Sequence, residues 1–326
     1  MTIQINMVSL FHITSERLMR IICKDDIETT DPSPCVATIG FFDGVHKGHH
    51  CLIRQVADLA NENCLKSLLI TFPEHPAKVL DSRFRPQLLT TADEKVELLK
   101  SSAADQVALL DFTRELSLLS AYDFMHKVLC EKLNVRMLVI GHDHRFGHNR
   151  NEGFDDYVRY GKEIGIEVVR AGALVDNELT YSSTAARKAL NEGRIADANS
   201  ILGYEYSFTG TVVGGFRVGR TIGFPTANIK VDSEEKIIPQ TGVYAVRAEN
   251  GGVVFGGMMN IGYRPTLANG DKKSIEVHLM DFDADIYSER LKISFVDFIR
   301  KEKKFNSIED LRAQLVLDEA RCRSII

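Results

Sequence analysis

The sequence predicts two domains: an α/β domain built on a doubly wound parallel sheet, and a small antiparallel β-barrel that ends in a C-terminal helix. Three observations predict this arrangement. Apolar runs alternate with helix-period segments in the first half, close turns separate short strands in the second, and 326 residues exceed a typical single domain. We expect the first domain to cover residues 1–203 and the second 204–326.

The first domain is predicted from short runs that are apolar throughout. The expected strands are VATIGF, SLLITF, VRMLVIG and IEVVRAG, at residues 36–41, 67–72, 135–141 and 166–172. Strands without polar alternation are typical of a parallel sheet that is covered on both faces. Helices are expected at 51–63, 92–101 and 120–133, where apolar side chains recur at helical spacing.

The second half has strand patterns separated by close turns. The expected strands lie within residues 206–215, 241–262, 273–282 and 290–300. The Glu249–Gly252 step, ENGG, is a strong hairpin signal. Residues 307–323 return to helical spacing after Ser307 and Asp310, which resemble a capping pair. Residues 183–203 are helical in pattern and form the expected boundary between the halves.

Composition limits the classes of function. Hydrophobic residues make up 44% and charged residues 26%, which is typical of a globular protein. A net charge of -5 gives no support for broad binding of nucleic acid or anionic membranes. The N-terminus has no basic leader before an apolar block, no uncharged stretch reaches a membrane-spanning length, and the six cysteines are scattered. We therefore expect a cytoplasmic protein, with no obligate protein partner indicated.

The stretch GFFDGVHKGHH, residues 40–50, follows the first predicted strand and precedes a predicted helix. Open parallel sheets bind ligands at this position, where a helix N-terminus offers free N–H groups to an anion. His46 and His49 are three residues apart and share one face of the first helical turn, so both can reach one phosphate group. Gly48 between them allows a ligand or strand to approach the backbone closely. The spacing suits stabilisation of a phosphorus centre during substitution in a nucleoside triphosphate.

Two other interpretations of this stretch exist. Any single histidine is more often a surface or capping residue than a catalytic one. A zinc site is disfavoured because His46, His49 and His50 have no cysteine or carboxylate partners at metal-site spacing. The complete string in its strand-turn-helix context favours the phosphate interpretation, and His50, outside the spacing, needs no role.

The stretch resembles the HxGH signature of nucleotidyltransferases, in the form found in bacterial bifunctional riboflavin kinase/FMN adenylyltransferases. TFPEHPAKVL, GHDHRFGHNRNEG and YSSTAARKAL continue the resemblance in order. It implies that His46 and His49 contact the phosphates of ATP. It also implies that Asp43 belongs to the nucleotide-site loop, together with Gly40, Phe41 and Gly48.

Two further stretches carry site residues by the same resemblance. SSTAAR is implied to close over the phosphates through Ser183, Thr184 and Arg187, and a guanidinium can hold two phosphate oxygens at once. Alone, that stretch could equally be a helix N-cap with a solvated arginine. The RFGHNR stretch is implied to line the flavin site, where a structural turn is the alternative for each residue; its candidates are Arg145, Phe146 and Asn149. The motif departs from its commoner form at His142 and His144.

A second candidate site lies in GGFRVGRTIGFPTANI, residues 214–229. Thr226 and Asn228 are two apart in an extended segment and point to one side, offering the hard oxygen ligands that Mg²⁺ accepts beside nucleotide phosphates. The glycine-rich part, with Gly214 and Arg220, could cradle those phosphates. By itself PTAN more often marks a β-turn followed by a strand.

The second stretch resembles the riboflavin kinase signature, and the match continues through GVYAV, NIGYRPT and EVHLMDFDADIY. In IEVHL, alternation puts Glu276 and His278 on one face. The resemblance implies that Glu276 is the catalytic carboxylate, whereas an isolated strand glutamate would be read as solvated. One departure is Ser288, where the family often has glycine, which matters if that turn needs a positive φ.

The expected function is FAD biosynthesis in two steps. Riboflavin kinase makes FMN and ADP from riboflavin and ATP, and FMN adenylyltransferase then transfers AMP from a second ATP to give FAD and pyrophosphate. The expected catalytic residues are His46, His49, Arg187 and Glu276, with Mg²⁺ as the cofactor and flavin as substrate and product. A flavin- or nucleotide-sensing protein is disfavoured because the reacting groups are retained, and a nucleotidyltransferase of another pathway is disfavoured by the kinase-like second half.

Overall fold

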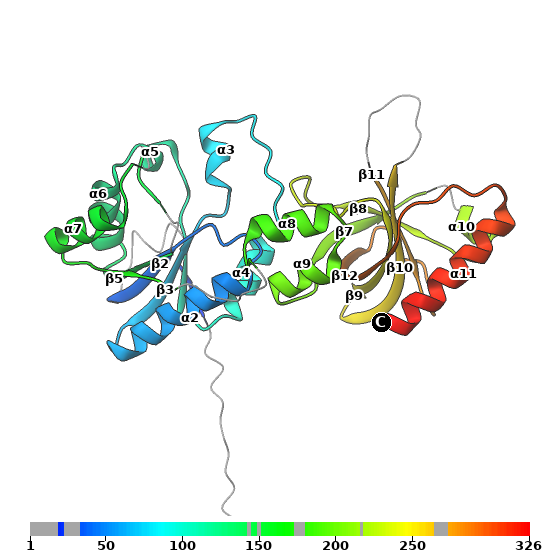
Figure 1. Ribbon diagram of the computed structural model, residues 1–326, viewed down its shortest axis with the longest axis horizontal. Helices are drawn as coiled ribbons and strands as arrows, with labels where there is room; N and C mark the ends of the chain where they lie inside the picture. Colours follow the sequence, from blue (N-terminus) through cyan, green and yellow to red (C-terminus); the bar gives the residue numbers. More distant parts are fainter. Residues whose placement is uncertain are drawn as a thin grey trace, which may run out of the picture.

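The computed structural model describes residues 19–22, 33–141, 145–148, 151–172, 180–215, 218–263 and 273–326, without the side chains of Val218 and Arg220. The chain forms two lobes side by side, one around a sheet and one around a barrel (Figure 1). Helices α8 (Ser183–Asn191) and α9 (Ile195–Leu202) lie between them.

The first lobe contains the predicted parallel sheet. Its strands are β1 (Arg20–Ile22), β2 (Cys35–Ile39), β3 (Lys66–Thr71), β4 (Gln106–Leu109), β5 (Val135–Ile140) and β6 (Glu167–Arg170). Their order is β1-β4-β3-β2-β5-β6 and every pairing is parallel. The doubly wound prediction is confirmed, although the short strands β1 and β4 were not predicted.

The order of the strands creates a switch point beside β2. From β2 the chain moves outward through β3 to β4, and it then returns to place β5 on the other side of β2. Connections that leave in opposite directions open a crevice at the carboxyl ends of these two strands. Helix α2 (Lys47–Glu62) starts at that edge, directly after the GFFDGVH segment.

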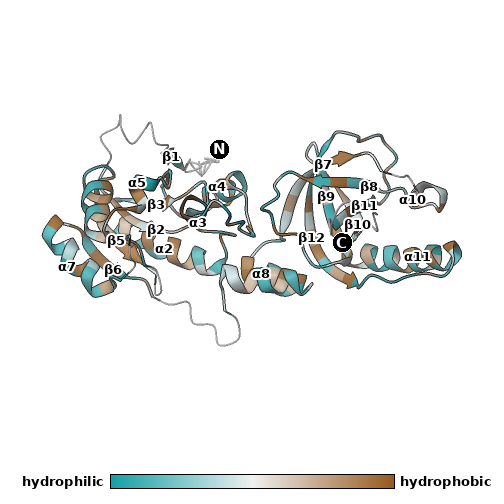
Figure 2. Cartoon of the chain, turned by 90° about the horizontal axis from the view of Figure 1, so that it is seen from above, coloured by the Kyte–Doolittle hydropathy of each residue, from teal (hydrophilic) through white to brown (hydrophobic). Residues whose placement is uncertain are grey.

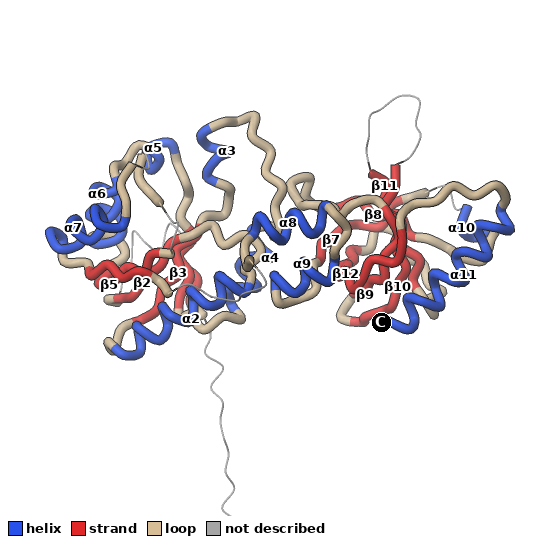
Figure 3. The backbone as a smooth tube through the Cα atoms, viewed as in Figure 1, coloured by secondary structure: helices blue, strands red, loops and turns tan. Residues whose placement is uncertain are grey.

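Helices cover both faces of the sheet, as Figure 3 shows for α2 below the strands and α7 above them. On one face Val36 packs with Val56 of α2, and α4 (Ala92–Lys100) packs there through Leu99. On the other face Ala37 packs in the same apolar cluster as the helices after β4. The remaining elements of this lobe are α3 (Pro76–Leu80), α5 (Arg114–Ser117), α6 (Ala121–Asp123), η1 (Phe124–Cys130) and α7 (Phe154–Ile164).

The predicted helix at 120–133 is wrong in type. A single α-helical turn, α6, leads into the π-helix η1. The difference lies in the backbone hydrogen bonds and not in the apolar pattern, since Phe124, Val128 and Leu129 are all buried in one cluster, as an α-helical stripe would also be. The backbone N–H of Leu133 accordingly donates to the Val128 carbonyl, five residues back, at 3.1 Å.

The second lobe is a closed antiparallel barrel in the order β10-β11-β8-β7-β12-β9, which confirms the prediction. Its strands are β7 (Ser207–Val213), β8 (Ala227–Val231), β9 (Gly242–Asn250), β10 (Val253–Tyr263), β11 (Lys273–Leu279) and β12 (Arg290–Arg300). Gly251 and Gly252 form the predicted hairpin, with φ of 56° and 84°.

Two helices accompany the barrel, α10 (Val218–Thr221) and α11 (Ile308–Ile325). The Ser307 hydroxyl caps α11 as predicted, by accepting the Asp310 N–H at 3.1 Å. Hydrophilic and hydrophobic residues both line α11 in Figure 2, and its buried Cys322 packs with Met258 on the outside of the barrel. In the part of the chain that the structure describes, no helix is long and apolar enough to cross a membrane.

The barrel interior and helices α8 and α9 share one apolar cluster. Val277 and Phe295 of the barrel belong to it, and so do Leu190 of α8 and Ile201 of α9. The same cluster includes Leu89 from the sheet domain. The two helices therefore pack on the barrel although the sheet domain precedes them directly in sequence.

Ser288, the departure noted in the sequence, lies in a turn that does need a positive φ. Its φ is 66°, in the left-handed region that costs a residue with a Cβ atom. We expect Ser288→Gly to raise the free energy of unfolding by about 0.5 to 1 kcal/mol. Chemical denaturation measures this, with Ser82→Gly as the control because exposed Ser82 lacks a positive φ. Equal or lower stability of Ser288→Gly would contradict the assignment of strain.

Candidate functional site

The loop at the carboxyl end of β2 has a strained backbone. Phe42, Gly44 and Val45 have φ of 53°, 76° and 35°, and a β-branched residue such as Val45 rarely occupies this region. The side chains of Phe42 and Val45 are buried, with exposed fractions of 2% and 0%. They pack with Ile53 of α2 and Leu99 of α4, and this packing holds the loop in its conformation.

His46 and His49 lie together at the start of α2. His46 is the N-cap of the helix, its Nδ1 accepts the His49 N–H at 3.3 Å, and the two rings stack with centroids 3.6 Å apart. Burial lowers the pKa of His46 to about 4, although Asp43 acts in the opposite direction, and burial lowers the pKa of His49 well below its usual value. Both rings are therefore neutral at pH 7. Because His46 Nδ1 accepts a hydrogen bond, its proton resides on Nε2, where it can be donated.

His49 has an unsatisfied polar atom. Its Nδ1 is buried and has no hydrogen-bond partner among the residues that the structure describes. Buried polar atoms of this kind usually have a partner, which a bound ligand or water can supply.

Gly48 explains why the two histidines need a glycine between them. A Cβ atom at Gly48 would lie 2.8 Å from the Tyr181 carbonyl oxygen and 3.1 Å from the His46 ring. The approaching group is thus the backbone that leads into α8. The HKGH and YSSTAAR stretches, far apart in sequence, meet at this point.

Asp43 and Arg187 form an ion pair across this junction. The Asp43 carboxylate is 3% exposed and accepts from Nη2 of Arg187. Nε of Arg187 donates to the Gln87 carbonyl at 2.7 Å. Ser183 Oγ donates to the backbone carbonyl of Asp43 at 2.9 Å. The structure therefore brings Asp43, Ser183, Arg187 and both histidines into one site.

The start of α8 combines this arrangement with an ordinary helix cap. Ser182 is the N-cap, and its hydroxyl accepts the Ala185 N–H at 3.1 Å. Thr184 is exposed in the first turn. The SSTAAR stretch is therefore both a helix N-cap and a neighbour of the histidine loop.

Gly40 and Phe41 connect this loop to β3. The Gly40 N–H donates to the Ile70 carbonyl at 3.0 Å, and the half-buried Phe41 accepts from Thr71 Oγ1 at 3.2 Å through its own carbonyl. Both residues thus bind the neighbouring strand through their backbone.

The predicted flavin-contacting residues are described only in part. Arg145 is exposed. Phe146 is buried and stacks on Tyr157 with centroids 4.2 Å apart, and its N–H donates to Tyr157 Oη at 3.1 Å. Phe146 is therefore part of the core in this structure, and its contact with flavin stays a prediction. Asn149, His142 and His144 lie outside the described residues.

Lys95 is a site residue that the sequence analysis missed. Its ammonium donates to the carbonyls of Phe41 at 3.1 Å and Phe72 at 2.6 Å, and it lies 4.0 Å from the centroid of the Phe41 ring. Burial lowers the pKa of Lys95 to about 8. Helical spacing could have predicted that Lys95 is buried, because it precedes the buried Leu99 by four residues and therefore lies on the apolar face of α4.

The barrel brings Thr226, Asn228 and Glu276 together. Glu276 of β11 pairs directly with Asn228 of β8, and Thr226 Oγ1 donates to Glu276 Oε2 at 3.4 Å. A Cβ atom on Gly215 would lie 1.9 Å from Asn228 Nδ2, so a larger residue there would displace the Asn228 amide. The predicted Gly214 is exposed with open space around it, and the glycine that approaches Asn228 is its neighbour, Gly215. The Arg220 side chain is outside the described residues.

Alternation along β11 is as predicted. Val277 faces the barrel interior, while Glu276 and His278 face outward. His278 Nδ1 donates to the Pro225 carbonyl at 2.8 Å, and its ring packs edge-on against Phe224. His278 therefore holds the start of the PTAN segment in place through the Pro225 carbonyl.

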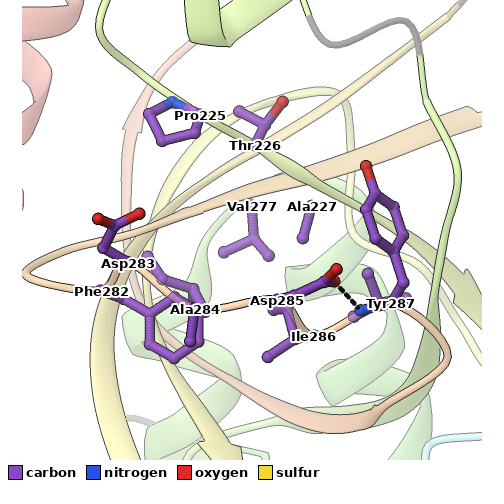
Figure 4. A pocket seen from close by; sticks show the side chains of 12 residues that line it. Pro225, Thr226, Ala227, Val277, Phe282, Asp283, Ala284, Asp285, Ile286 and Tyr287 are labelled. Carbon is purple, nitrogen blue, oxygen red and sulfur yellow. Dashed lines mark hydrogen bonds between the residues drawn. The ribbon is translucent and has the colours of Figure 1, made fainter.

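A cavity of about 520 Å³ opens beside Thr226 (Figure 4). Its other wall is formed by the segment after β11, where the Tyr287 N–H donates to Asp285 Oδ1 at 3.0 Å. Apolar side chains such as Val277 and Phe282 line the cavity together with these polar groups. A cavity of this size and lining is typical of a small-molecule site.

A parallel sheet with paired neutral histidines, and a barrel with oxygen ligands beside a carboxylate, define a two-domain transferase that acts on nucleotide phosphates. Family models agree with this class: one described as FAD synthetase matches residues 28–185, and one described as riboflavin kinase matches residues 202–326.

Two curated relatives are bifunctional riboflavin kinase/FMN adenylyltransferases. The protein from Listeria monocytogenes is 38% identical over 299 residues, which cover 91% of this chain and 94% of the relative. The protein from Escherichia coli K12 is 36% identical over 290 residues, covering 89% and 92%. A crystal structure described as a macrolide-efflux protein from Streptococcus pneumoniae has a TM-score of 0.84 and 31% identity, covering 94% of this chain and 99% of that one. The chain belongs to the bifunctional riboflavin kinase/FMN adenylyltransferase family.

The contact at Gly48 can be tested with one methyl group. We expect Gly48→Ala to lower the rate of FAD formation from FMN by about tenfold or more, because a shift of the HKGH turn misplaces both histidines. Riboflavin phosphorylation by the same preparation should be unchanged. Gly172→Ala is the control, since a Cβ atom there would make only ordinary contacts with Gln55. Normal FAD formation by Gly48→Ala would show that the close approach of Tyr181 is not required.

Proposed function

We propose that the two activities of this family are divided between the domains at residues 203 and 204. The barrel would phosphorylate riboflavin with ATP, giving FMN and ADP. The sheet domain would transfer AMP from a second ATP to FMN, giving FAD and pyrophosphate. The observation that carries this division is the difference in burial and hydrogen bonding between two carboxylates, Asp43 and Glu276.

Asp43 is unsuited to be a base. Its carboxylate accepts from four donors: the N–H groups of Leu89 and Thr90, the Thr90 hydroxyl and the Arg187 guanidinium. Adenylyl transfer does not need a base, because the attacking FMN phosphate is already anionic. The neutral histidines His46 and His49 would donate to the phosphate oxygens as charge develops there. Arg187, at the same edge, would offset charge on the departing pyrophosphate.

Glu276 suits the other step. It is half-buried and accepts from the Thr226 hydroxyl at 3.4 Å, and Thr226, unlike Glu276, also lines the cavity. The kinase reaction attacks with a neutral alcohol, which needs a proton acceptor. Glu276 would accept the proton of the terminal ribityl hydroxyl as the oxygen attacks the γ-phosphorus of ATP.

The donor set beside Glu276 fits Mg²⁺. Asn228 and Glu276 lie on the adjacent strands β8 and β11, and Thr226 directly precedes β8. A hydroxyl, an amide oxygen and a carboxylate, all hard oxygen donors, therefore lie close together, and Gly215 leaves room for the amide. Thr226 and Asn228 would hold the ion with the help of the nucleotide phosphates. When bound, the ion supplies charge neutralisation for the transferred phosphoryl group. We also propose a cytoplasmic location, which the scattered cysteines support.

The role of the histidines is tested by a variant that keeps the helix cap. We expect His46→Asn/His49→Asn to abolish FAD formation while FMN accumulates, because asparagine can cap α2 but lacks the imidazole donor. Chromatography of a reaction with riboflavin, ATP and Mg²⁺ separates the products. His50→Asn, on the same helix, is the control. FAD formation at the normal rate by the double variant would refute the role of the histidines.

The role of Glu276 is tested in the opposite direction. We expect Glu276→Gln to slow riboflavin phosphorylation by about 10² to 10⁴-fold, because the amide cannot accept the proton. Supplied FMN should still be converted to FAD. The matched control is Glu249→Gln, an exposed glutamate on β9. Undiminished riboflavin phosphorylation by Glu276→Gln would exclude Glu276 as the base. If the wild-type protein bound flavin but converted none of it, the protein would be a flavin sensor rather than an enzyme.

A further inference from the structure

A short strip of the sheet domain, residues 88–90, lies between Asp43 and the barrel domain. On the barrel side, the Leu88 N–H donates to the Glu235 carbonyl at 2.7 Å, and the Ile237 N–H donates to the Leu88 carbonyl at 3.0 Å. On the other side, the N–H groups of Leu89 and Thr90 donate to the Asp43 carboxylate at 3.0 to 3.1 Å. The strip is thus hydrogen-bonded on both edges.

Each of two consecutive peptide groups is held from both ends. In the first, the Leu88 carbonyl accepts from Ile237 while the Leu89 N–H of the same peptide donates to Asp43. In the second, the Leu89 carbonyl accepts from the Lys236 ammonium at 2.6 Å while the Thr90 N–H donates to Asp43 at 3.0 Å. Hydrogen bonds in such chains polarise and strengthen one another, and the second chain is charged at both ends.

Lys236 is the charged group at the barrel end of this chain. Its side chain is 2% exposed, and its ammonium pairs with Glu94 of α4 as well as with the Leu89 carbonyl. The ammonium also lies 4.9 Å from the centroid of the Tyr206 ring. Burial lowers the pKa of Lys236 and Glu94 acts to raise it. A buried ammonium that loses one partner is costly, so these contacts define one position for the Leu89 carbonyl.

The strip also determines where Arg187 lies. Arg187 binds Asp43 through Nη2 and the Gln87 carbonyl, immediately before the strip, through Nε at 2.7 Å. Both partners of this guanidinium therefore depend on residues 87–90. A displacement of the strip would move Arg187 relative to His46 and His49.

We propose that Lys236, a residue of the barrel domain, is a positioning residue for adenylyl transfer in the sheet domain. It acts through the Leu89–Thr90 peptide group on Asp43, and through Asp43 on Arg187. This inference rests on the proposed role of the histidine site. The proposal gives the barrel domain a structural role in adenylyl transfer, separate from its own proposed role in riboflavin phosphorylation.

The test uses Lys236→Met in the full-length enzyme, with both reactions measured on one preparation. We expect kcat for FAD formation from FMN to fall by about tenfold or more, while KM for ATP changes less, because Arg187 is displaced from the leaving group rather than the nucleotide being excluded. Riboflavin phosphorylation should stay within about twofold of wild type. Lys230→Met, an exposed lysine on β8, is the control.

Two further variants separate positioning from folding. Lys236→Arg should recover part of the lost FAD-forming rate, because a guanidinium also donates to the Leu89 carbonyl and Glu94. Glu94→Gln should lower the same rate less than Lys236→Met does, and the double variant should lose less than the product of the two separate losses. If Lys236→Met does not fold, Glu94→Gln decides, and an unchanged rate of FAD formation there overturns the proposal.

Other outcomes also overturn it. A normal kcat for FAD formation in Lys236→Met would show that the hydrogen-bonded link from Lys236 through the Leu89–Thr90 peptide group to Asp43 has no effect on catalysis. Equal loss of both activities together with a lower melting temperature would show that Lys236 only stabilises the fold. If the wild-type protein itself formed no FAD from FMN and ATP in this assay, the proposed function would fail, which is a different result from either of these.

Discussion

The buried carboxylate of Asp43 is the constraint on which the junction of this molecule depends. A carboxylate with an exposed fraction of 3% must be compensated, because moving an isolated charge out of water costs far more than a domain's net stability. Four donors compensate it, and they come from a strip before α4 and from α8. Satisfying one charge therefore sets the relative positions of the histidine loop, the strip and α8.

The two sites solve different electrostatic problems. At the sheet edge, burial keeps His46 and His49 neutral, so two positively charged rings are not placed in contact at 3.6 Å. In the barrel, Glu276 lies half-buried on the outer face, where the hydroxyl of Thr226 and the amide of Asn228 are its neighbours. A neutral donor pair suits an attacking group that is already anionic, whereas a carboxylate suits a neutral alcohol. In the proposed division of the reactions, each site thus matches the charge state of its nucleophile.

Much of this structure could be predicted from the sequence, because its signals are local. Strands β2, β3 and β5, the ENGG hairpin and the capping pair before α11 depend on a few neighbouring residues, and each was predicted. The π-helix was not predicted, because a stripe with four- and five-residue spacing resembles an α-helical stripe. Gly215 was missed because its contact with Asn228 forms only when the chain folds back from β7 to pair with β8. Lysines are hardest to place. A lysine among charged residues, such as Lys236, looks solvated unless its distant partners are known.

Contacts of this long-range kind also change what a domain boundary means. The FAD synthetase family model ends at residue 185, within α8, and the riboflavin kinase model begins at residue 202. Helices α8 and α9 nevertheless share an apolar cluster with the barrel, while the first turns of α8 carry Ser183 and Arg187. One helix therefore ends on the core of the barrel and begins beside Asp43 and the histidine loop. Because cores are close-packed, a displacement at the barrel end of α8 is transmitted to its N-terminus rather than absorbed. Under the proposed role of Lys236, the two reactions are separate in chemistry, but the geometry of adenylyl transfer in the sheet domain depends on the folded barrel domain.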